Sequence, residues 1–182
     1  ILSGVHIPMI EQIKKNPAIE VVSRPARRAI YMDIGNKPGT PFADVRVRKA
    51  IAMAINEDEI VSTVMRGQAT PAAQVPDTAT IGYDPELKRL PYDPEQSKAL
   101  LKEAGYENGF EITIAGPNDR YVNDKQICEA VARYLARIGL TVNLDVKPKS
   151  IFFDELASNK HDFYLIGWMD GSYDFGRSAQ LL

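Results

Sequence analysis

The stretch that begins at Gly116, Gly-Pro-Asn-Asp-Arg-Tyr-Val-Asn, follows an apolar run and carries a guanidinium beside a phenol and amides. A guanidinium presents two parallel N–H donors that fit the two oxygens of a carboxylate. The stretch also leads into a helical pattern, and a helix N-terminus attracts anions. It therefore predicts a site for an anionic group, with the candidate residues Arg120, Tyr121 and Asn123. Spacing alone leaves a second interpretation equally open, in which Arg120 forms a surface ion pair with Asp119 or Asp124.

A second polar loop follows the apolar run 162–168. It holds the candidate site residues Trp168, Asp170, Tyr173 and Asp174 within a short span. An aromatic side chain with carboxylates in a flexible loop is typical of the lining of small-ligand sites. A packed tryptophan followed by a polar turn explains the same residues, and the sequence does not separate these two interpretations.

Motifs for nucleotide, metal or nucleophilic chemistry are missing from the sequence. It contains no G-x-G-x-x-G, no G-x-x-x-x-G-K-[ST], no H-E-x-x-H and no G-x-S-x-G. The two histidines, His6 and His161, are far apart in sequence, which indicates surface or turn positions rather than a metal site. Cys128 borders the apolar stripe of a predicted helix, so we expect a buried structural thiol. We expect no cofactor and no bound metal, and an enzyme is disfavoured.

The charge balance argues against a nucleic-acid partner. The chain has 182 residues, with 22 lysines and arginines against 24 aspartates and glutamates, and a net charge of −2. The basic run 24–28 is predicted to be a solvated strand edge, because nucleic-acid binding requires more positive charge and interleaved aromatic residues. The sequence has no apolar run long enough to span a membrane, and its first residues lead us to expect no leader peptide within it. Both ends look cut, so we expect a fragment of a longer protein.

The hydrophobic periodicities predict an α/β fold with a mixed sheet and flanking helices in a single domain, 1–182. Helices are predicted at 9–15, 45–55, 57–66, 94–104, 124–138 and 150–157, with N-caps at Asp44, Asn56, Asp93, Asn123 and Ser150. Strands are predicted at 19–22, 27–35, 110–115, 140–146 and 162–168. The irregular segment 67–92 is predicted to be a long surface loop, either a connector or functional.

These elements bring the two polar loops together. The second half of the sequence reads strand–helix–strand–helix–strand, and helical crossovers are what parallel strands require. The strands that end near 116 and 168 should open at the same carboxyl edge of the sheet, where α/β folds bind ligands.

Several longer motifs resemble the extracytoplasmic solute-binding proteins of the peptide/nickel family, family 5, which serve ABC importers. The resemblance lies in PFADVRVRKAIAMAINEDEIVSTVMRGQATPA, in GYDPELKRLPYDPEQSKALLKEAGYENGF, and in LARIGLTVNLDV and DFYLIGW. These segments keep the order of the family and together extend over nearly the whole chain.

The resemblance implies one lobe of a two-lobed, class C-like periplasmic binding protein, which would close on a small solute and deliver it to ABC permease subunits. It further implies a periplasmic monomer whose full-length form has a signal peptide. In dipeptide-binding relatives an arginine at the position of Arg120 holds the ligand carboxylate. The acidic residue that such relatives place three after the tryptophan is Gly171 here, with Asp170 and Asp174 nearby. The solute therefore stays open between a di- or oligopeptide and a glutathione-like compound.

A second hypothesis belongs to a different class of protein. A stand-alone α/β enzyme domain, hydrolase-like, would use Arg120 with Asp170 or Asp174. A hydrolase should have a deep, self-contained pocket with a nucleophile and a base, whereas a receptor lobe should have an open, one-sided face.

Overall fold

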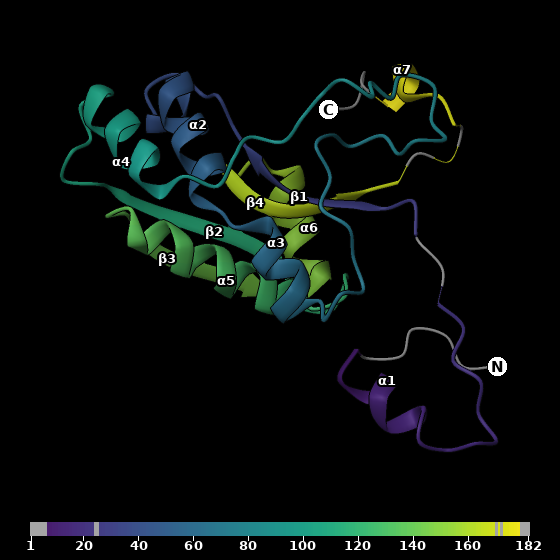
Figure 1. Ribbon diagram of the computed structural model, residues 1–182. Coiled ribbons are helices and arrows are strands. Elements are labelled where there is room, and N and C mark those ends of the chain that lie inside the picture. The colour runs from purple at the N-terminus through teal and green to yellow at the C-terminus, as the bar shows by residue number, and fades with distance from the viewer. Residues whose placement is uncertain (1–6, 24–25, 170, 172, 179–182) are drawn as a thin grey trace.

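A computed structural model describes residues 7–23, 26–169, 171 and 173–178 (Figure 1). Its strands are β1 (Ala29–Ile34), β2 (Glu111–Pro117), β3 (Thr141–Lys147) and β4 (Phe163–Trp168). Its helices are α1 (Ile7–Ile13), α2 (Val45–Ala54), α3 (Glu57–Glu59), α4 (Pro94–Glu103), α5 (Asp124–Arg137), α6 (Lys149–Ala157) and α7 (Phe175–Ser178). A 3-10 turn, η1 (Pro41–Ala43), and a π-helical turn, η2 (Ile60–Val64), complete the elements.

The four strands form one mixed sheet in the order β1-β4-β2-β3. Strand β2 is parallel to β3 and to β4, and helices α5 and α6 make the crossovers. Strand β1 runs antiparallel to β4, with Ala29 opposite Trp168. The predicted α/β class and mixed sheet are confirmed. The ends of β2 and β4 and the start of β1 therefore meet at one edge, which we call the carboxyl edge.

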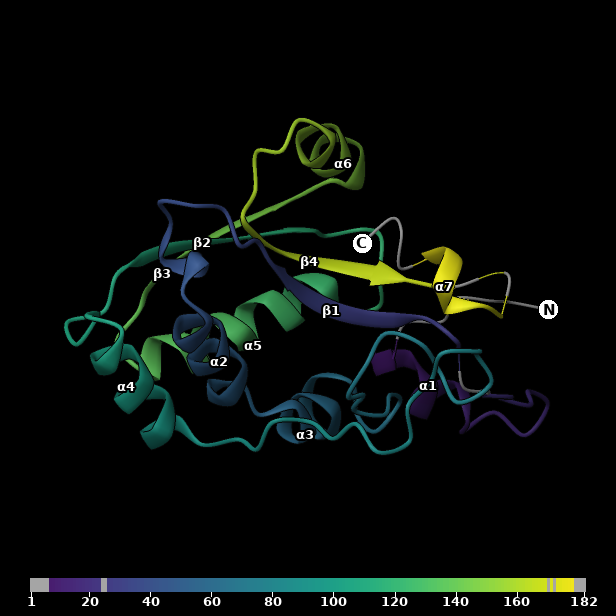
Figure 2. The same ribbon diagram turned by 90° about the horizontal axis from the view of Figure 1, so that it is seen from above.

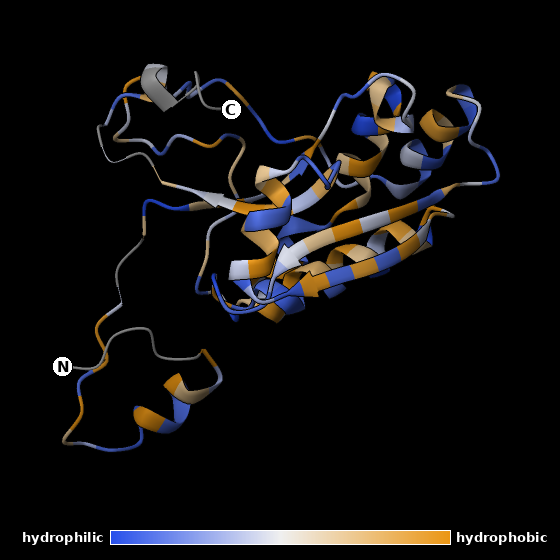
Figure 3. Ribbon diagram, turned by 180° about the vertical axis from the view of Figure 1, so that it is seen from behind, coloured by the Kyte–Doolittle hydropathy of each residue, from blue (hydrophilic) through white to orange (hydrophobic). Residues whose placement is uncertain are grey.

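Helices cover both faces of the sheet. In Figure 2, α6 lies on one side of the strands, and α2, α4 and α5 lie on the other. The main core lies on the α5 side, where Ile51, Ile114, Leu135 and Leu165 are at most 1% exposed. Figure 3 shows apolar and polar residues alternating along the strands, as expected when one face packs on the core. None of the described helices is long and apolar enough to cross a bilayer.

The lone cysteine is part of this core. Cys128 on α5 has no solvent exposure, and its burial raises the pKa of the thiol to about 12. A Cβ added at Gly116 of β2 would come within 3.0 Å of the cysteine sulfur. The prediction of a structural thiol is therefore confirmed, because a buried, protonated sulfur is a poor nucleophile.

Three predicted N-caps are confirmed, because the side chains of Asp44, Asn56 and Asp93 accept hydrogen bonds from backbone N–H groups in the first turn. The cap predicted at Asn123 is wrong. Its backbone is left-handed, with φ 54°, and its side-chain amide donates to the carbonyl oxygen of Val64 instead. The cap predicted at Ser150 is also wrong. Helix α6 begins at Lys149, whose backbone N–H donates to the carboxylate of Asp119, 2.7 Å away.

Two further predictions differ from the structure. Residues 19–22 are not a strand; they are largely exposed and pair with none of the sheet strands. The helix predicted at 57–66 ends earlier, and its second half is the π-helical turn η2. Residues 65–93, which include the predicted loop 67–92, hold turns and one isolated bridge from Ile81 to Asp174.

Candidate functional site

The loop between β2 and α5 is held in a fixed shape at the carboxyl edge. The carboxylate of Asp124, 3% exposed, accepts the backbone N–H groups of Arg120 and Tyr121, both at 2.9 Å. The amide of Asn123 fastens the same loop to the carbonyl of Val64 at 2.8 Å. The carboxylate thus satisfies loop N–H groups ahead of the helix, and the backbone that carries Arg120 and Tyr121 has little freedom.

Tyr121 connects this loop to the end of β4. Its ring is half-buried, and its hydroxyl lies 3.4 Å from the carbonyl oxygen of Gly167, to which it donates. A Cβ at Gly167 would lie 2.8 Å from the tyrosine ring, closer than real side chains approach. Glycine at this position therefore allows Tyr121 to lie across the strand.

Two arginines lie over Tyr121. The Cζ atom of Arg120 is 5.2 Å from the centre of the tyrosine ring, and that of Arg28 is 5.9 Å from it. Arg120 is exposed and Arg28 is half-buried. Within the described part of the chain, neither guanidinium makes an ion pair with a carboxylate.

The alternative role for Arg120, an ion pair with a neighbouring aspartate, is not what the structure contains. Asp119 contacts Lys149 instead, and the carboxylate of Asp124 accepts backbone N–H groups. The guanidinium of Arg120 is thus open to an external anion.

Trp168, the last residue of β4, lies on the other face of the sheet from Tyr121. Neighbouring residues of a strand point to opposite faces, and Gly167 is the residue that faces Tyr121. The indole Nε1 of Trp168 is buried and has no hydrogen-bond partner among the described residues. The structure thus places Trp168 next to Gly167, over which Tyr121 lies, and the plane of the strand separates the side chains of Trp168 and Tyr121.

Residues after β4 are held by a second arginine contact. Arg27 stacks on the ring of Tyr173, with its Cζ 3.6 Å from the ring centre, and donates to Asp77 at 2.6 Å and to Thr80 at 2.9 Å. The hydrogen bond between Arg27 and Asp77 raises the pKa of the guanidinium and lowers that of the carboxyl. The long loop, the start of β1 and the segment after β4 are therefore fastened together.

Asp174 belongs to the same junction. It pairs with Ile81 in an isolated bridge, and its carboxylate accepts the backbone N–H of Gly176 at 3.0 Å. Asp170, the other candidate acid, lies outside the described residues.

Sequence reasoning missed the part that Arg27 and Arg28 play. We predicted a solvated strand edge for the basic run 24–28, yet both described arginines of that run are half-buried against tyrosines of the carboxyl edge. The antiparallel pairing of β1 with β4 brings them there. That pairing joins segments far apart in the sequence, so no local sequence pattern predicts it.

Comparisons with known proteins agree with the resemblance. The profile of the bacterial extracellular solute-binding proteins, family 5 (middle region), matches residues 1–181. The chain belongs to this family. It is 29% identical over 168 residues to the dipeptide-binding protein of Escherichia coli strain K12, covering 91% of this chain and 31% of that protein. It is 36% identical over 131 residues to a glutathione-binding protein of Shigella flexneri, covering 70% of this chain and 25% of that protein.

Solved structures of the family share the fold. The ABC transporter-associated periplasmic binding protein DppA from Helicobacter pylori, in complex with the peptide STSA, superposes with a TM-score of 0.81 at 28% identity. The match covers 92% of this chain and 32% of that protein. This family 5 chain thus spans about a third of the length of the relatives it matches. The structural neighbours are two-lobed periplasmic binding proteins, as the sequence resemblance implied.

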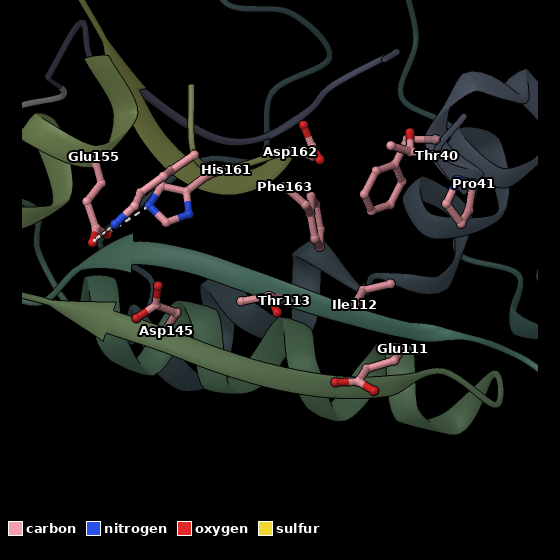
Figure 4. Close-up of a pocket in the computed structure, with 12 residues that line it drawn as sticks. Thr40, Pro41, Glu111, Ile112, Thr113, Asp145, Glu155, His161, Asp162 and Phe163 are labelled. Atoms are coloured by element: carbon pink, nitrogen blue, oxygen red, sulfur yellow. Dashed lines mark hydrogen bonds and ion pairs between the residues drawn. The ribbon is translucent and has the colours of Figure 1, made fainter. Parts of the chain in front are cut away.

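The family 5 chain also has a groove of about 510 Å³ at the opposite end of the strands from the carboxyl edge. Figure 4 shows the side chains that line it, with His161 pointing toward Glu155. The groove is lined by Thr40, Pro41, Phe42, Glu111, Ile112, Thr113, Asp145, Glu155, Lys160, His161, Asp162 and Phe163. Neither Arg120 nor Tyr121 is among the residues that line it.

Three residues near this groove have ligand atoms within 4.8 Å of one another, Asp145, Glu155 and His161. The ammonium of Lys147 lies between the two carboxylates, 2.7 Å from Asp145 and 2.6 Å from Glu155. A lysine ammonium therefore occupies the place of a cation, and the group acts as an ion-pair network that joins β3 to α6. His161 lies in the connection between α6 and β4, which agrees with the turn position that the sequence offered. The surface alternative is wrong, because its side chain is only 9% exposed and stacks on Phe152.

Acid should weaken this network. Hydrogen bonds from Lys147 and then Lys160 lower the pKa of Glu155 to about 2, from an ordinary value of 4.5. The stabilisation of the fold by these ion pairs is therefore complete above about pH 4.5, and it is lost as the pH falls through about 2. We expect Glu155→Gln to have a lower melting temperature than the wild type at pH 7. The melting temperatures of the two proteins should become equal near pH 2. Thermal unfolding followed by circular dichroism from pH 7 to pH 2 measures this.

The matched control is Glu86→Gln, since Glu86 is exposed and has no ion pair among the described residues. This variant should follow the wild-type melting temperature at every pH. A constant offset between wild type and Glu155→Gln down to pH 2 would contradict the assignment.

Proposed function

We propose that this chain is one lobe, residues 1–182, of the substrate-binding component of an ABC importer. The whole receptor captures a peptide-like solute between two lobes outside the cytoplasm and delivers it to a membrane permease. The observation that carries the proposal is the carboxyl edge, where the guanidinium of Arg120 stacks on Tyr121 with no carboxylate partner among the described residues. Family membership and peptide-binding relatives support it.

The open form of the edge suits a receptor better than an enzyme. Arg120 lies on an exposed face, and neither it nor Tyr121 lines the groove of about 510 Å³ near the starts of β2 and β4. A second lobe that closes over the edge would remove water from Arg120 and strengthen its hydrogen bonds to a carboxylate. In this proposal Tyr121 and Asn123 shape the anion site, and Asp170, Tyr173 and Asp174 line the rim. Trp168, which the sequence also suggested for the rim, is left out of it because its side chain lies on the other face of the sheet from Tyr121.

Isothermal titration calorimetry of the full-length receptor tests the proposal. The probes are Ala-Ala, glutathione and Ala-Ala amide, which lacks the terminal carboxylate. We expect at least one of the first two to bind, and the amide to bind at least about tenfold more weakly than Ala-Ala, because the charge-assisted bonds to Arg120 are lost. Mass spectrometry should recover the peptides intact.

Two results would overturn the proposal. If neither Ala-Ala nor glutathione binds, the proposal of a peptide-like solute is wrong. Hydrolysis of either compound by the receptor would favour the enzyme hypothesis.

A further inference from the structure

Three arginines meet at the carboxyl edge, and only Arg27 is neutralised within the described residues. Its guanidinium is 26% exposed and pairs with Asp77 at 2.6 Å. Arg28, which is half-buried, and Arg120, which is exposed, make no such pair, and both lie over the ring of Tyr121. A guanidinium that is partly removed from water without a carboxylate partner loses solvation that nothing else in the described chain restores.

Both unpaired guanidiniums lie over one ring. Their Cζ atoms are 5.9 Å and 5.2 Å from the centre of Tyr121, so they are no farther apart than the sum of these two distances. Each contact with the ring is a weak cation–π attraction, whereas the two positive charges repel each other. An anion on each guanidinium would remove this repulsion. A single carboxylate would offset only one of the two positive charges.

The backbone holds Arg28 at this place. It directly precedes β1, whose first residue, Ala29, pairs with Trp168 at the end of β4. Tyr121 in turn donates to Gly167 of β4. The segments that carry the two arginines are thus connected to neighbouring positions of one strand.

We infer that the solute carries two anionic groups, one bound by Arg120 and the second by Arg28. This inference rests on the proposed function and narrows it to solutes with a second carboxylate, such as acidic peptides and compounds of the glutathione type. Arg28 is then a residue that determines specificity, and the solute's first carboxylate is held without it.

Matched dipeptides isolate the second charge. Glutamate and glutamine have the same shape and differ by one negative charge, so Ala-Glu is compared with Ala-Gln, and Glu-Ala with Gln-Ala. Calorimetry on the full-length receptor should show at least about a tenfold preference for the glutamate peptide in one of the two orders. Arg28→Gln should abolish this preference and leave the affinity for the glutamine peptide within about twofold.

Arg133→Gln is the control. Arg133 is exposed on α5, and its replacement removes the same charge as Arg28→Gln does. It should keep the full preference, which separates a local contact from a general effect of charge. Arg120→Gln should weaken all four peptides.

Each other outcome contradicts the inference in a different way. If the glutamate and glutamine peptides bind equally to the wild type, the inference of a second anionic group is wrong, whereas the proposed function stands. If Arg28→Gln weakens both members of a pair equally, Arg28 binds the first carboxylate and the inference is wrong. If none of the four peptides binds, the proposed function fails and the inference fails with it.

Discussion

Replacing Arg120 with alanine should weaken the binding of a carboxylate-bearing solute to the full-length receptor by about ten- to a hundredfold. A hydrogen-bonded pair with a charged group contributes roughly 1.5–3 kcal/mol when it is shielded from water, and this range corresponds to that loss. Arg120→Lys should recover little of the affinity, because an ammonium lacks the planar fork of the guanidinium. Titration calorimetry with the peptide that the wild type prefers measures both variants.

The control for this prediction is Arg133→Ala, on the exposed surface of α5. It should bind like the wild type. Wild-type affinity in Arg120→Ala would show that the anion site lies elsewhere, even though the chain belongs to family 5.

Gly109→Ala should destabilise the fold by about 3 kcal/mol or more, a large part of the roughly 5–15 kcal/mol that holds a domain together. Gly109 has φ 69°, and an added Cβ would overlap the backbone carbonyl of Gly139. The two glycines lie at the turns that lead into β2 and β3, where Thr141 donates to the carbonyl of Phe110 at 3.0 Å. Separating these turns would disturb the pairing of the two strands. Urea unfolding followed by circular dichroism gives the free-energy change.

Gly105→Ala is the matched control in the preceding turn, which ends α4. Gly105 also has a left-handed backbone, with φ 87°, but an added Cβ there would meet no atom within 4 Å. It should cost only about 1–2 kcal/mol, the strain of a left-handed alanine. Equal losses in the two variants would mean that the close approach to Gly139 has no energetic weight.

Local sequence patterns predicted the features that depend on interactions between residues close in sequence. The caps at Asp44 and Asp93 are contacts between a side chain and a backbone N–H two or three residues along the chain, so neighbouring residues suffice to predict them. The sheet strands and the helices around them follow from hydrophobic periodicity. The α/β class and the loop that carries Arg120 could be predicted for the same reason.

Contacts between distant segments account for the errors. Asn123 fails as a cap because its amide finds the carbonyl of Val64, 59 residues away in sequence, and Ser150 is replaced as a cap by Asp119. The position of Arg28 depends in the same way on the register of β1 against β4. At the candidate site, the sequence pointed to the β2–α5 loop and missed Arg28, which directly precedes β1.

The order of the strands has a consequence for folding during synthesis on the ribosome. Strand β1, Ala29–Ile34, pairs with β4, Phe163–Trp168, so its hydrogen-bonding partner is made last. At roughly 5–20 residues per second, the start of the sheet waits on the order of ten seconds for this partner. During that time Ile30, Met32 and Ile34, which pack on the core in the folded chain, remain uncovered. Until β4 has been made, the unpaired edge and apolar side chains of this strand are therefore open to pairing with other chains.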